Sequence, residues 1–577
     1  MLIARGLDRA ALAAALITAT IVGFDRIDPS LGVTQDLRLT DLRAIATLTL
    51  GLWLLSRCLS RRRPRVPRRL AVPLIVWLAC LAVSAALAPS YQTQALAFVR
   101  DLTFGAFFAW AVYDLTDSRP RQLLVLRTAA IGGLAIAAFA LLEAANVRPV
   151  VDWLAGFRYQ TSFSVGEIPR VSSTLPHPNI AAMLLGMTLP LLIAWLVTTR
   201  HRLIRIGAAF GIGIELAALV LTVSRAGIVL MEVVLGLLLI IGIWQRQPAL
   251  ANASLCAAIG LPVLVGLLLA AQPVLRLHTT GEGVEGWYSV EYSTPDAFSA
   301  HAGEATTVPV RLANTGTRTW TSSGDHPFAL SYHLDHADGA PLTFDGPRTA
   351  LPHDVEPGAS VDLQAQLIAP QAPGSYVVEW DEVQESVTWF SWTGTPPTRT
   401  YLTVAAPVAG TVEQPIAQTP EPALGPPPPP GRLALWRMAL RMARNRPLLG
   451  VGPDNFRWVY GDFAGVPEWD TGVHANSVYF EWLADTGVLG LAAFVWLSWR
   501  LLRESATGLL EWRMPSGSSS WWVWRMALLA SLVVWFVHGF LDYFYEPLPT
   551  SLAFWLIAAL AVSMAQRAPV HMDTKCA

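Results

Sequence analysis

The chain has 577 residues, of which 53% are hydrophobic and 14% are charged, and its mean hydropathy is +0.42. Soluble domains carry roughly 25% charged residues, so this composition excludes an ordinary soluble enzyme. The formal net charge of -1 provides no basic excess to neutralise phosphates, which argues against nucleic-acid binding. The four cysteines are too few for a disulfide framework. The composition predicts a membrane protein.

Apolar runs long enough to cross a bilayer, about 20 residues each, recur along the chain. We identify twelve, and they predict a polytopic α-helical membrane protein with nine spans in residues 1–277 and three in residues 487–577. The runs begin near Ala10, Asp41, Leu70, Ala95, Gln122, Asn179, Leu203, Gly227, Leu250, Gly487, Trp521 and Pro549.

Arginine placement predicts the orientation of these spans. The connection after the second run holds seven arginines between Arg57 and Arg69 and no acidic residue, and basic loops stay in the cytoplasm. Both termini are then cytoplasmic, in a multi-pass protein of the cytoplasmic membrane. The long connections 146–178, 272–486 and 541–548 face outward, where neither ATP nor nucleotide sugars are available.

Residues 278–405 predict an inserted β domain. Alternating runs such as Thr307–Leu312 and Ser360–Ala365 are separated by Gly, Pro, Asn and Asp clusters, a spacing typical of a β-sandwich. The stretches "NTGTRTW", "EPG" and "PGSYVVEW" resemble an Ig-like module of bacterial surface proteins. Trp389 and Trp392 are either a sugar-stacking platform or part of the core of this domain.

Two further segments follow the β domain. Residues 406–431 include Pro426 to Pro430 in a row, which is typical of an extended polyproline II linker. Residues 432–486 begin with an amphipathic helix and continue into an outward loop. In that helix Leu433, Trp436 and Leu440 share one stripe, and the arginines share another. The arginine stripe consists of Arg437, Arg441 and Arg444.

Four motifs stand in order along the outward-facing parts of the chain. They are "LPHPNIAAMLL" from Leu175, "LTVSRAG" from Leu221, "RPLLGVGPDNF" from Arg446, and "HANS…EWLADTGVLGL" from His474. Together with the span layout, they resemble the O-antigen ligase and polymerase superfamily of membrane glycosyltransferases. The resemblance covers most of the chain outside the β insert and implies a fold of the GT-C kind.

The resemblance implies an extracytoplasmic transferase. Such an enzyme moves a glycan from an undecaprenyl-diphosphate carrier to the hydroxyl of a glycan, lipid or protein acceptor, without a cofactor or a metal. A polymerase that joins carrier-linked units is the nearest alternative. A polysaccharide transporter and a membrane-anchored binding protein that works through its β domain are more distant ones. Membrane lipids are expected partners and nucleic acids are not.

Charge and proton transfer select three candidate catalytic residues. The leaving group is a lipid diphosphate, which arginine binds bidentately while staying charged. This favours Arg225, at the outer tip of a helical hairpin, and Arg432, which matches the arginine that the family carries ahead of a tryptophan. Interfacial arginines with no catalytic role are the alternative. Histidine suits the general base that an acceptor hydroxyl needs, which favours His474. The family's usual histidine falls at Asn476. Either His474 takes over the role of the base, or the base lies elsewhere and Asn476 only orients a substrate hydroxyl.

Four further residues are candidate substrate ligands. Arg100 stands with Asp101 inside a span, as a donor-binding group or a structural ion pair. Arg170 and His177 lie in the loop before the sixth span, where a solvated loop is the alternative. Asp542, at the outer end of the eleventh span, is expected to orient His474 or the acceptor.

Overall fold

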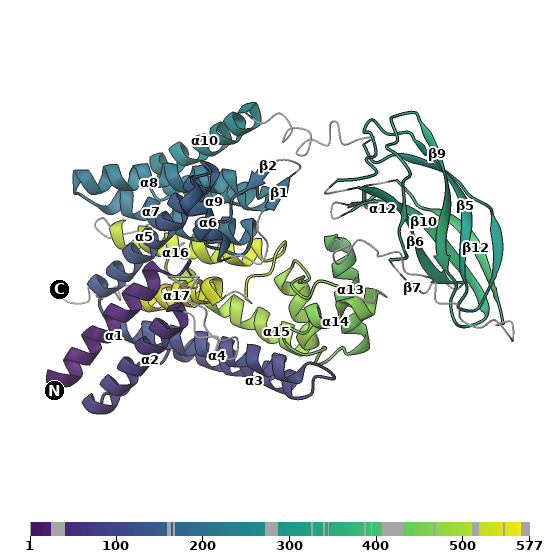
Figure 1. The fold of residues 1–577 in the computed structure, drawn as a ribbon. Helices are drawn as coiled ribbons and strands as arrows, with labels where there is room; N and C mark the ends of the chain where they lie inside the picture. Colours follow the sequence, from purple (N-terminus) through teal and green to yellow (C-terminus); the bar gives the residue numbers. More distant parts are fainter. Residues whose placement is uncertain are drawn as a thin grey trace. The chain divides into compact units, whose positions relative to one another are not determined.

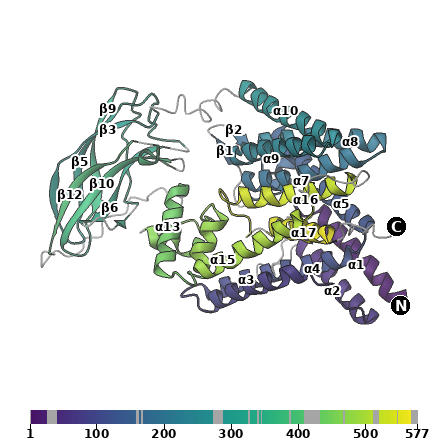
Figure 2. The same ribbon diagram turned by 180° about the vertical axis from the view of Figure 1, so that it is seen from behind.

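The computed structural model divides into two compact units, shown from two sides in Figures 1 and 2. The first comprises Met1–Leu275, Asn445–Asn455 and Asn476–Ala577, and the second comprises Arg276–Arg444 and Phe456–Ala475. The described residues are 2–24, 41–157, 163–165, 168–271, 287–324, 327–337, 341–343, 345–385, 388–393, 395–406, 431–464, 469–509, 519–545 and 548–566. The predicted proline-rich linker, apart from its two end residues, lies outside them.

The first unit is helical. Its helices are α1 (Leu2–Thr20), α2 (Asp41–Ser60), α3 (Arg68–Ala86), α4 (Gln92–Leu115), α5 (Arg119–Ala144), α6 (Arg148–Ala155), α7 (Pro178–Thr198), α8 (Arg202–Leu221), α9 (Arg225–Trp244), α10 (Pro248–Ala271), α15 (Val478–Ala506), α16 (Ser519–His538) and α17 (Leu548–Ala565). A short hairpin of β1 (Phe163–Val165) and β2 (Ile168–Arg170) precedes α7.

Each of the twelve predicted apolar runs forms a helix, and among the described residues eleven helices are long and apolar enough to cross a membrane. The chain is thus a multi-pass membrane protein. The remaining predicted span corresponds to α1. This helix is long enough to cross a membrane, but it carries Arg5, Asp8 and Arg9 in its first half, and these charges make it less suited to a bilayer core.

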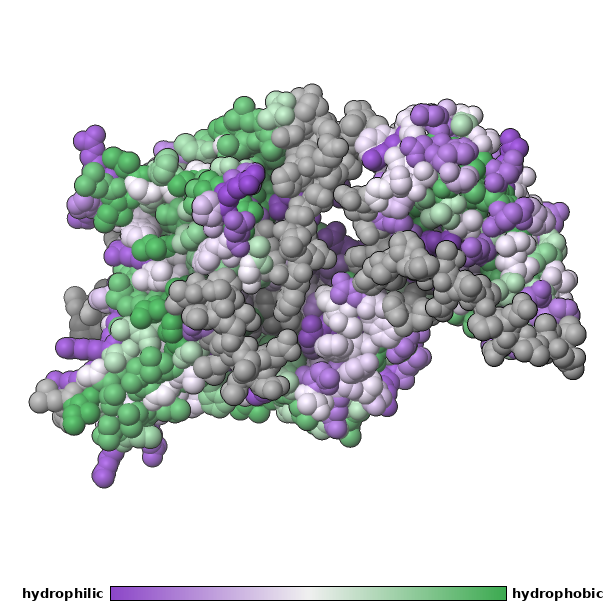
Figure 3. All heavy atoms as spheres, in the orientation of Figure 1, coloured by the Kyte–Doolittle hydropathy of each residue, from purple (hydrophilic) through white to green (hydrophobic). Residues whose placement is uncertain are grey.

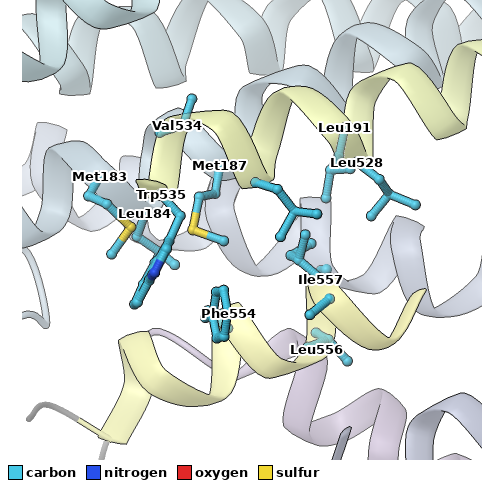
Figure 4. Packing of buried hydrophobic residues seen from close by; sticks show 14 of the residues in the cluster. Met183, Leu184, Met187, Leu191, Leu528, Val534, Trp535, Phe554, Leu556 and Ile557 are labelled. Carbon is cyan, nitrogen blue, oxygen red and sulfur yellow. The ribbon is translucent and has the colours of Figure 1, made fainter. Parts of the chain in front are cut away.

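Helices α7, α16 and α17 are buried over most of their length and form the centre of this unit. Figure 4 shows Met183 and Met187 of α7 beside Trp535 of α16 and Phe554 of α17. Such uniformly apolar helices have no polar face to turn toward water, and the flanking helices cover them instead.

Outer helices turn apolar side chains away from this core. Val233 and Ile240 of α9 and Ile259 and Leu267 of α10 are more than half exposed, as lipid-facing side chains would be. On the face drawn in Figure 3, hydrophobic residues cover much of the helical unit, whereas the β region is mostly hydrophilic. An apolar surface of this kind is stable in contact with the hydrocarbon chains of lipids, which cannot solvate polar groups.

Helix α15 is broken at Gly487, whose φ of 62° and ψ of -166° are non-helical. The break frees helical carbonyl groups, and the loop that contains "LLGVGPDN" supplies their hydrogen-bond donors. The Val451 N–H donates to the Ala484 carbonyl at 3.0 Å, and the Gly452 N–H donates to the Asp485 carbonyl at 2.8 Å.

The exchange also runs in the opposite direction. The Val488 N–H, just past the break, donates to the carbonyl of Pro447 at 2.8 Å, and the Ser84 hydroxyl of α3 donates to the Leu449 carbonyl at 2.6 Å. A Cβ atom on Gly450 would lie 2.3 Å from the Asp485 carbonyl carbon. The two neighbouring sequence motifs are therefore one structural device, a loop inserted into a broken helix.

The β region of the second unit contains two sheets. One has the order β4-β12-β10-β6-β7, with β11 on β10 and β8 on β6, and the other has the order β3-β5-β9. The strands are β3 (Val290–Ser293), β4 (Ala297–His301), β5 (Ala305–Asn314), β6 (Phe328–His336), β7 (Pro341–Thr343), β8 (Thr349–Ala350), β9 (Ser360–Ile368), β10 (Gly374–Gln384), β11 (Thr388–Trp389) and β12 (Thr398–Ala405), and the one-turn helix α12 is Phe390–Thr393.

Alternate residues of both sheets face a shared apolar core, as in a sandwich. The predicted runs Thr307–Leu312 and Ser360–Ala365 lie in β5 and β9, which pair antiparallel. Trp389 is fully buried, and its ring packs at a tilt against His333, so it is not a surface platform for sugars.

Gly487→Ala is predicted to destabilise the helical unit by more than about 1–3 kcal/mol, the usual strain of a sparsely populated backbone conformation. The added Cβ would also lie 2.4 Å from the Leu448 carbonyl carbon. Thermal unfolding of the detergent-solubilised protein measures the loss. Gly266→Ala in α10, where a Cβ meets no atom within 4 Å, is the matched control. Equal unfolding temperatures for both variants would contradict the insertion.

Candidate active site

Arg170 joins the ends of three elements in the helical unit. Its Nε donates to the carbonyl of Thr222 in the α8–α9 turn at 2.9 Å, and its Nη2 donates to Oδ1 of Asn179 in α7 at 2.8 Å. The adjacent Val171 N–H donates to the Leu221 carbonyl at 3.3 Å. The guanidinium fork therefore holds the "VSRAG" turn against the start of α7.

The segment that follows Arg170 is buried, which corrects the alternative of a solvated loop. Residues 171–175 are all buried, and Oε2 of Glu143 accepts the backbone N–H of Ser173 at 2.8 Å. His177 caps α7, since its Nδ1 accepts the N–H of Asn179 at 3.1 Å. Because Nδ1 is an acceptor there, the neutral ring carries its proton on Nε2.

Arg225 is the first residue of α9 and is exposed. Its neighbour Ser224 caps the helix by accepting the Gly227 N–H at 3.4 Å. Among the residues that the structure describes, Arg225 forms no hydrogen bond or ion pair. A cation at a helix N-terminus opposes the helix dipole, whereas an anion bound there would meet both the dipole and the guanidinium.

The C-terminal end of α16 connects this group to the start of α15. A Cβ on Gly227 would lie 2.8 Å from the Ala182 Cβ and 3.5 Å from Cε1 of His538, so α9 packs directly on α7 and the buried His538 ring. One residue later, the Gly539 carbonyl accepts the Val478 N–H at 2.7 Å.

Asn476 and Asp542 flank the same contact. The Val478 N–H also points to the Asp542 carbonyl at 3.1 Å, and Oδ1 of Asp542 accepts the Tyr543 N–H at 2.9 Å. Asn476 has a φ of 49°, a left-handed conformation that asparagine tolerates better than most residues. The structure thus places Arg170, His177, Arg225, Asn476 and Asp542 around the adjoining ends of α7, α9, α15 and α16.

Arg100 belongs to a different local group. Both Arg100 and Arg43 of α2 donate to the carboxylate of Asp101, with Arg43 bidentate at 2.8 and 3.0 Å. Asp101 is therefore the acidic partner in an ion pair between α2 and α4. The Arg100 side chain stays 64% exposed, so it is available to a further anion.

In the second unit, Arg432 is the first residue of α13 (Arg432–Asn445). It is exposed and without a hydrogen bond or ion pair in the described part of the chain. The buried face of α13 is not the predicted stripe of Leu433, Trp436 and Leu440, since Leu433 is 66% exposed. The buried residues are Leu435, Met438, Ala439, Met442 and Ala443. Four of these five buried residues are methionine or alanine, which mark an apolar helix face less clearly than leucine and tryptophan do.

His474 follows a compact turn after α14 (Phe456–Ala464). The Asp470 side chain accepts the Gly472 N–H at 2.8 Å, and the Tyr460 hydroxyl donates to the Asp470 carbonyl at 3.2 Å. Burial, with a contribution from the Asp470 charge, raises the pKa of Tyr460, which keeps it a neutral donor. His474 itself is half-buried.

Three acidic residues at the broken helix are not among the predicted site residues. Asp454, Glu481 and Asp485 are all buried, and Oδ2 of Asp485 accepts the Asp454 N–H at 2.7 Å. Carboxylate oxygens of Asp454 and Glu481 lie within 4.8 Å of one another, so the pair could hold a proton or a cation. The i, i+4 spacing of Glu481 and Asp485 was the available signal.

Comparison with known families bears on the segment that contains the inserted loop. Residues 401–495 match the family model described as O-antigen ligase. This O-antigen ligase domain includes both "RPLLGVGPDNF" and "HANS…EWLADTGVLGL", with Arg432, His474 and Asn476. Arg100, Arg170, His177, Arg225 and Asp542 lie outside the matched residues. The match supports a membrane enzyme of the glycosyltransferase type in surface polysaccharide biosynthesis.

Other comparisons add little. No curated protein matches the chain. A PapD-like domain of human CEP192 is 15% identical over 21% of this chain and 87% of its own, with a TM-score of 0.12. The alkylpurine DNA glycosylase AlkC of Pseudomonas fluorescens, bound to DNA with an abasic site analog, is 11% identical over 59% and 98%, with a TM-score of 0.16. TM-scores this low carry no conclusion about fold or function.

Arg170→Ala is predicted to lower the stability of the helical unit by about 1.5–3 kcal/mol for a lost charged hydrogen bond. Arg225→Ala is predicted to change it by less than about 0.5 kcal/mol, as for other exposed positions. Unfolding curves of both variants in one detergent test the difference. A large loss for Arg225→Ala would show that this side chain has a structural role.

Proposed function

We propose that the protein transfers a glycan from an undecaprenyl-diphosphate carrier to an acceptor hydroxyl on the outer side of the cytoplasmic membrane. The observation that carries the proposal is the match of residues 401–495 to the O-antigen ligase family. The arginine-rich connection between Arg57 and Arg69 supports this orientation, because basic connections stay in the cytoplasm.

Arg225 supports the donor side of this proposal. An exposed arginine at a helix N-terminus, with no partner in the described residues, suits a diphosphate. Its fork can bind two phosphate oxygens, and the first N–H groups of α9 add partial positive charge. Arg432 is likewise exposed at the start of α13. Its match to the family's arginine ahead of a tryptophan supports its assignment as the second phosphate ligand.

The reaction is a substitution at the anomeric carbon of the donor sugar. The acceptor oxygen forms a bond to that carbon, and the bond between the carbon and the diphosphate oxygen breaks. His474 takes the acceptor proton as the general base, and undecaprenyl diphosphate leaves with the electron pair. The arginines stabilise the negative charge that grows on the leaving oxygen.

The acceptor distinguishes the two closest reactions. In the ligase reaction the hydroxyl belongs to a separate glycan, lipid or protein, and in the polymerase reaction it belongs to a second carrier-linked glycan. The same donor groups serve both reactions, and of the two we propose the ligase reaction. Arg170, His177, Asn476 and Asp542 are proposed to position the substrates around this step.

Arg225→Ala and Arg432→Ala are each predicted to reduce glycan transfer by about 100-fold or more, the usual effect of removing one group that stabilises developing charge. The assay uses purified protein, a carrier-linked donor and a hydroxyl acceptor, and separates acceptor-linked glycan from lengthened carrier-linked glycan. Arg202→Ala, exposed at the start of α8, is the control and should retain wild-type turnover. Full activity of both test variants would refute the donor assignment.

His474→Ala is predicted to reduce turnover by about 100-fold to 10,000-fold, the range for a lost general base. Asn476→Gly removes the side chain but keeps a residue that accepts the positive φ, so it isolates the side-chain role, and a smaller loss is expected. The measurement is turnover against pH. An unchanged pH profile in His474→Ala would assign the base to another residue.

A further inference from the structure

An apolar cavity lies between α3, α4, α15 and α17 of the helical unit. Its empty volume is about 560 Å³, part of it open to the surroundings, and its lining includes Leu70, Ala109, Leu501 and Val562. The lining is almost entirely apolar and offers water few hydrogen-bond partners. A hydrocarbon chain is therefore the occupant that fits.

The cavity is at the arginine-rich end of these helices. Pro67 and Leu70, at the start of α3, line it, whereas Ser84 near the other end of α3 contacts the inserted loop. Fourteen residues of helix separate Leu70 from Ser84, or about 21 Å at 1.5 Å per residue. The cavity is therefore remote from the site built around Arg225, and it faces the side that the arginine pattern assigns to the cytoplasm.

Basic side chains gather where the cavity-lining helices end. Arg500 near the end of α15 donates to the Arg69 carbonyl at 3.5 Å, and Arg69 pairs with Glu504 at 3.3 Å. Arg68 is exposed at the start of α3, and the guanidinium of Arg503 lies 5.3 Å from the Trp499 ring. Within the described residues, Arg68, Arg500 and Arg503 have no acidic partner.

We infer that this cavity binds an anionic phospholipid of the cytoplasmic leaflet, with an acyl chain among the apolar side chains and the phosphate among Arg68, Arg500 and Arg503. Apolar lining and uncompensated positive charge match the two parts of such a lipid. The site is independent of glycan transfer. It would hold α3 against α15, the two helices that also support the inserted loop.

The test measures lipid bound to the full-length protein. Protein purified in detergent is mixed with phosphatidylglycerol or phosphatidylcholine, and retained lipid is counted by native mass spectrometry alongside the unfolding temperature. We expect phosphatidylglycerol to be retained and to raise the unfolding temperature, and phosphatidylcholine to do neither. Combined Arg68→Gln, Arg500→Gln and Arg503→Gln should weaken retention by about 100-fold, the effect of three basic residues at an anionic lipid surface.

Two pairs of variants separate this site from general lipid attraction. Ala109→Trp fills the cavity and should abolish retention, whereas Val72→Trp on the exposed side of α3 should not. Arg205→Gln, exposed on α8, is the charge control. If Ala109→Trp unfolds, the arginine variants decide the result. Equal retention of the two lipids, unchanged retention in the arginine variants, or displacement of phosphatidylglycerol by undecaprenyl phosphate would overturn the inference.

Discussion

The exchange of backbone hydrogen bonds at Gly487 is the constraint on which one end of the helical unit depends, the end opposite the arginine-rich connections. A helix broken near a membrane leaves N–H and C=O groups that lipid cannot satisfy. Here the loop at 447–452 donates to the carbonyls before the break and accepts from the N–H groups after it. Breaking α15 is therefore possible only together with this loop, and the loop can hold its positive-φ glycines only against the broken helix.

That exchange also orders what surrounds it. The Ser84 hydroxyl ties α3 to the loop, and the Asn455 amide reaches the Ser90 carbonyl before α4. The first turn of α15, nine residues before the break, is held by the Gly539 and Asp542 carbonyls that follow α16, beside His538 and the start of α9. A backbone device at one helix thus determines where Asn476, Asp542 and Arg225 stand relative to each other within this unit.

Arginines of the helical unit find two different kinds of partner. At the arginine-rich end, acidic residues form ion pairs between helices, as Asp114 does with Arg57. At the opposite end, Arg170 makes hydrogen bonds to backbone and amide oxygens instead, and Arg225 is exposed without a partner in the described residues. Arg225 thereby differs from Arg170, whose guanidinium is already hydrogen-bonded to oxygens of the protein.

Hydropathy alone determined the membrane class, the positions of the helices and the presence of a β region, because span length and strand alternation are local properties of the chain. The resemblance of the motifs, together with side-chain chemistry, also indicated Arg225, Arg432 and His474 as candidates. The tertiary structure decided which face of α13 is buried, that the loop after Arg170 is packed rather than solvated, and that Asp454, Glu481 and Asp485 are buried together. Those outcomes depend on hydrogen bonds and packing between segments far apart in sequence. The break at Gly487 is the clearest case: the glycine is visible in the sequence, but its conformation follows from a loop that precedes it by more than thirty residues.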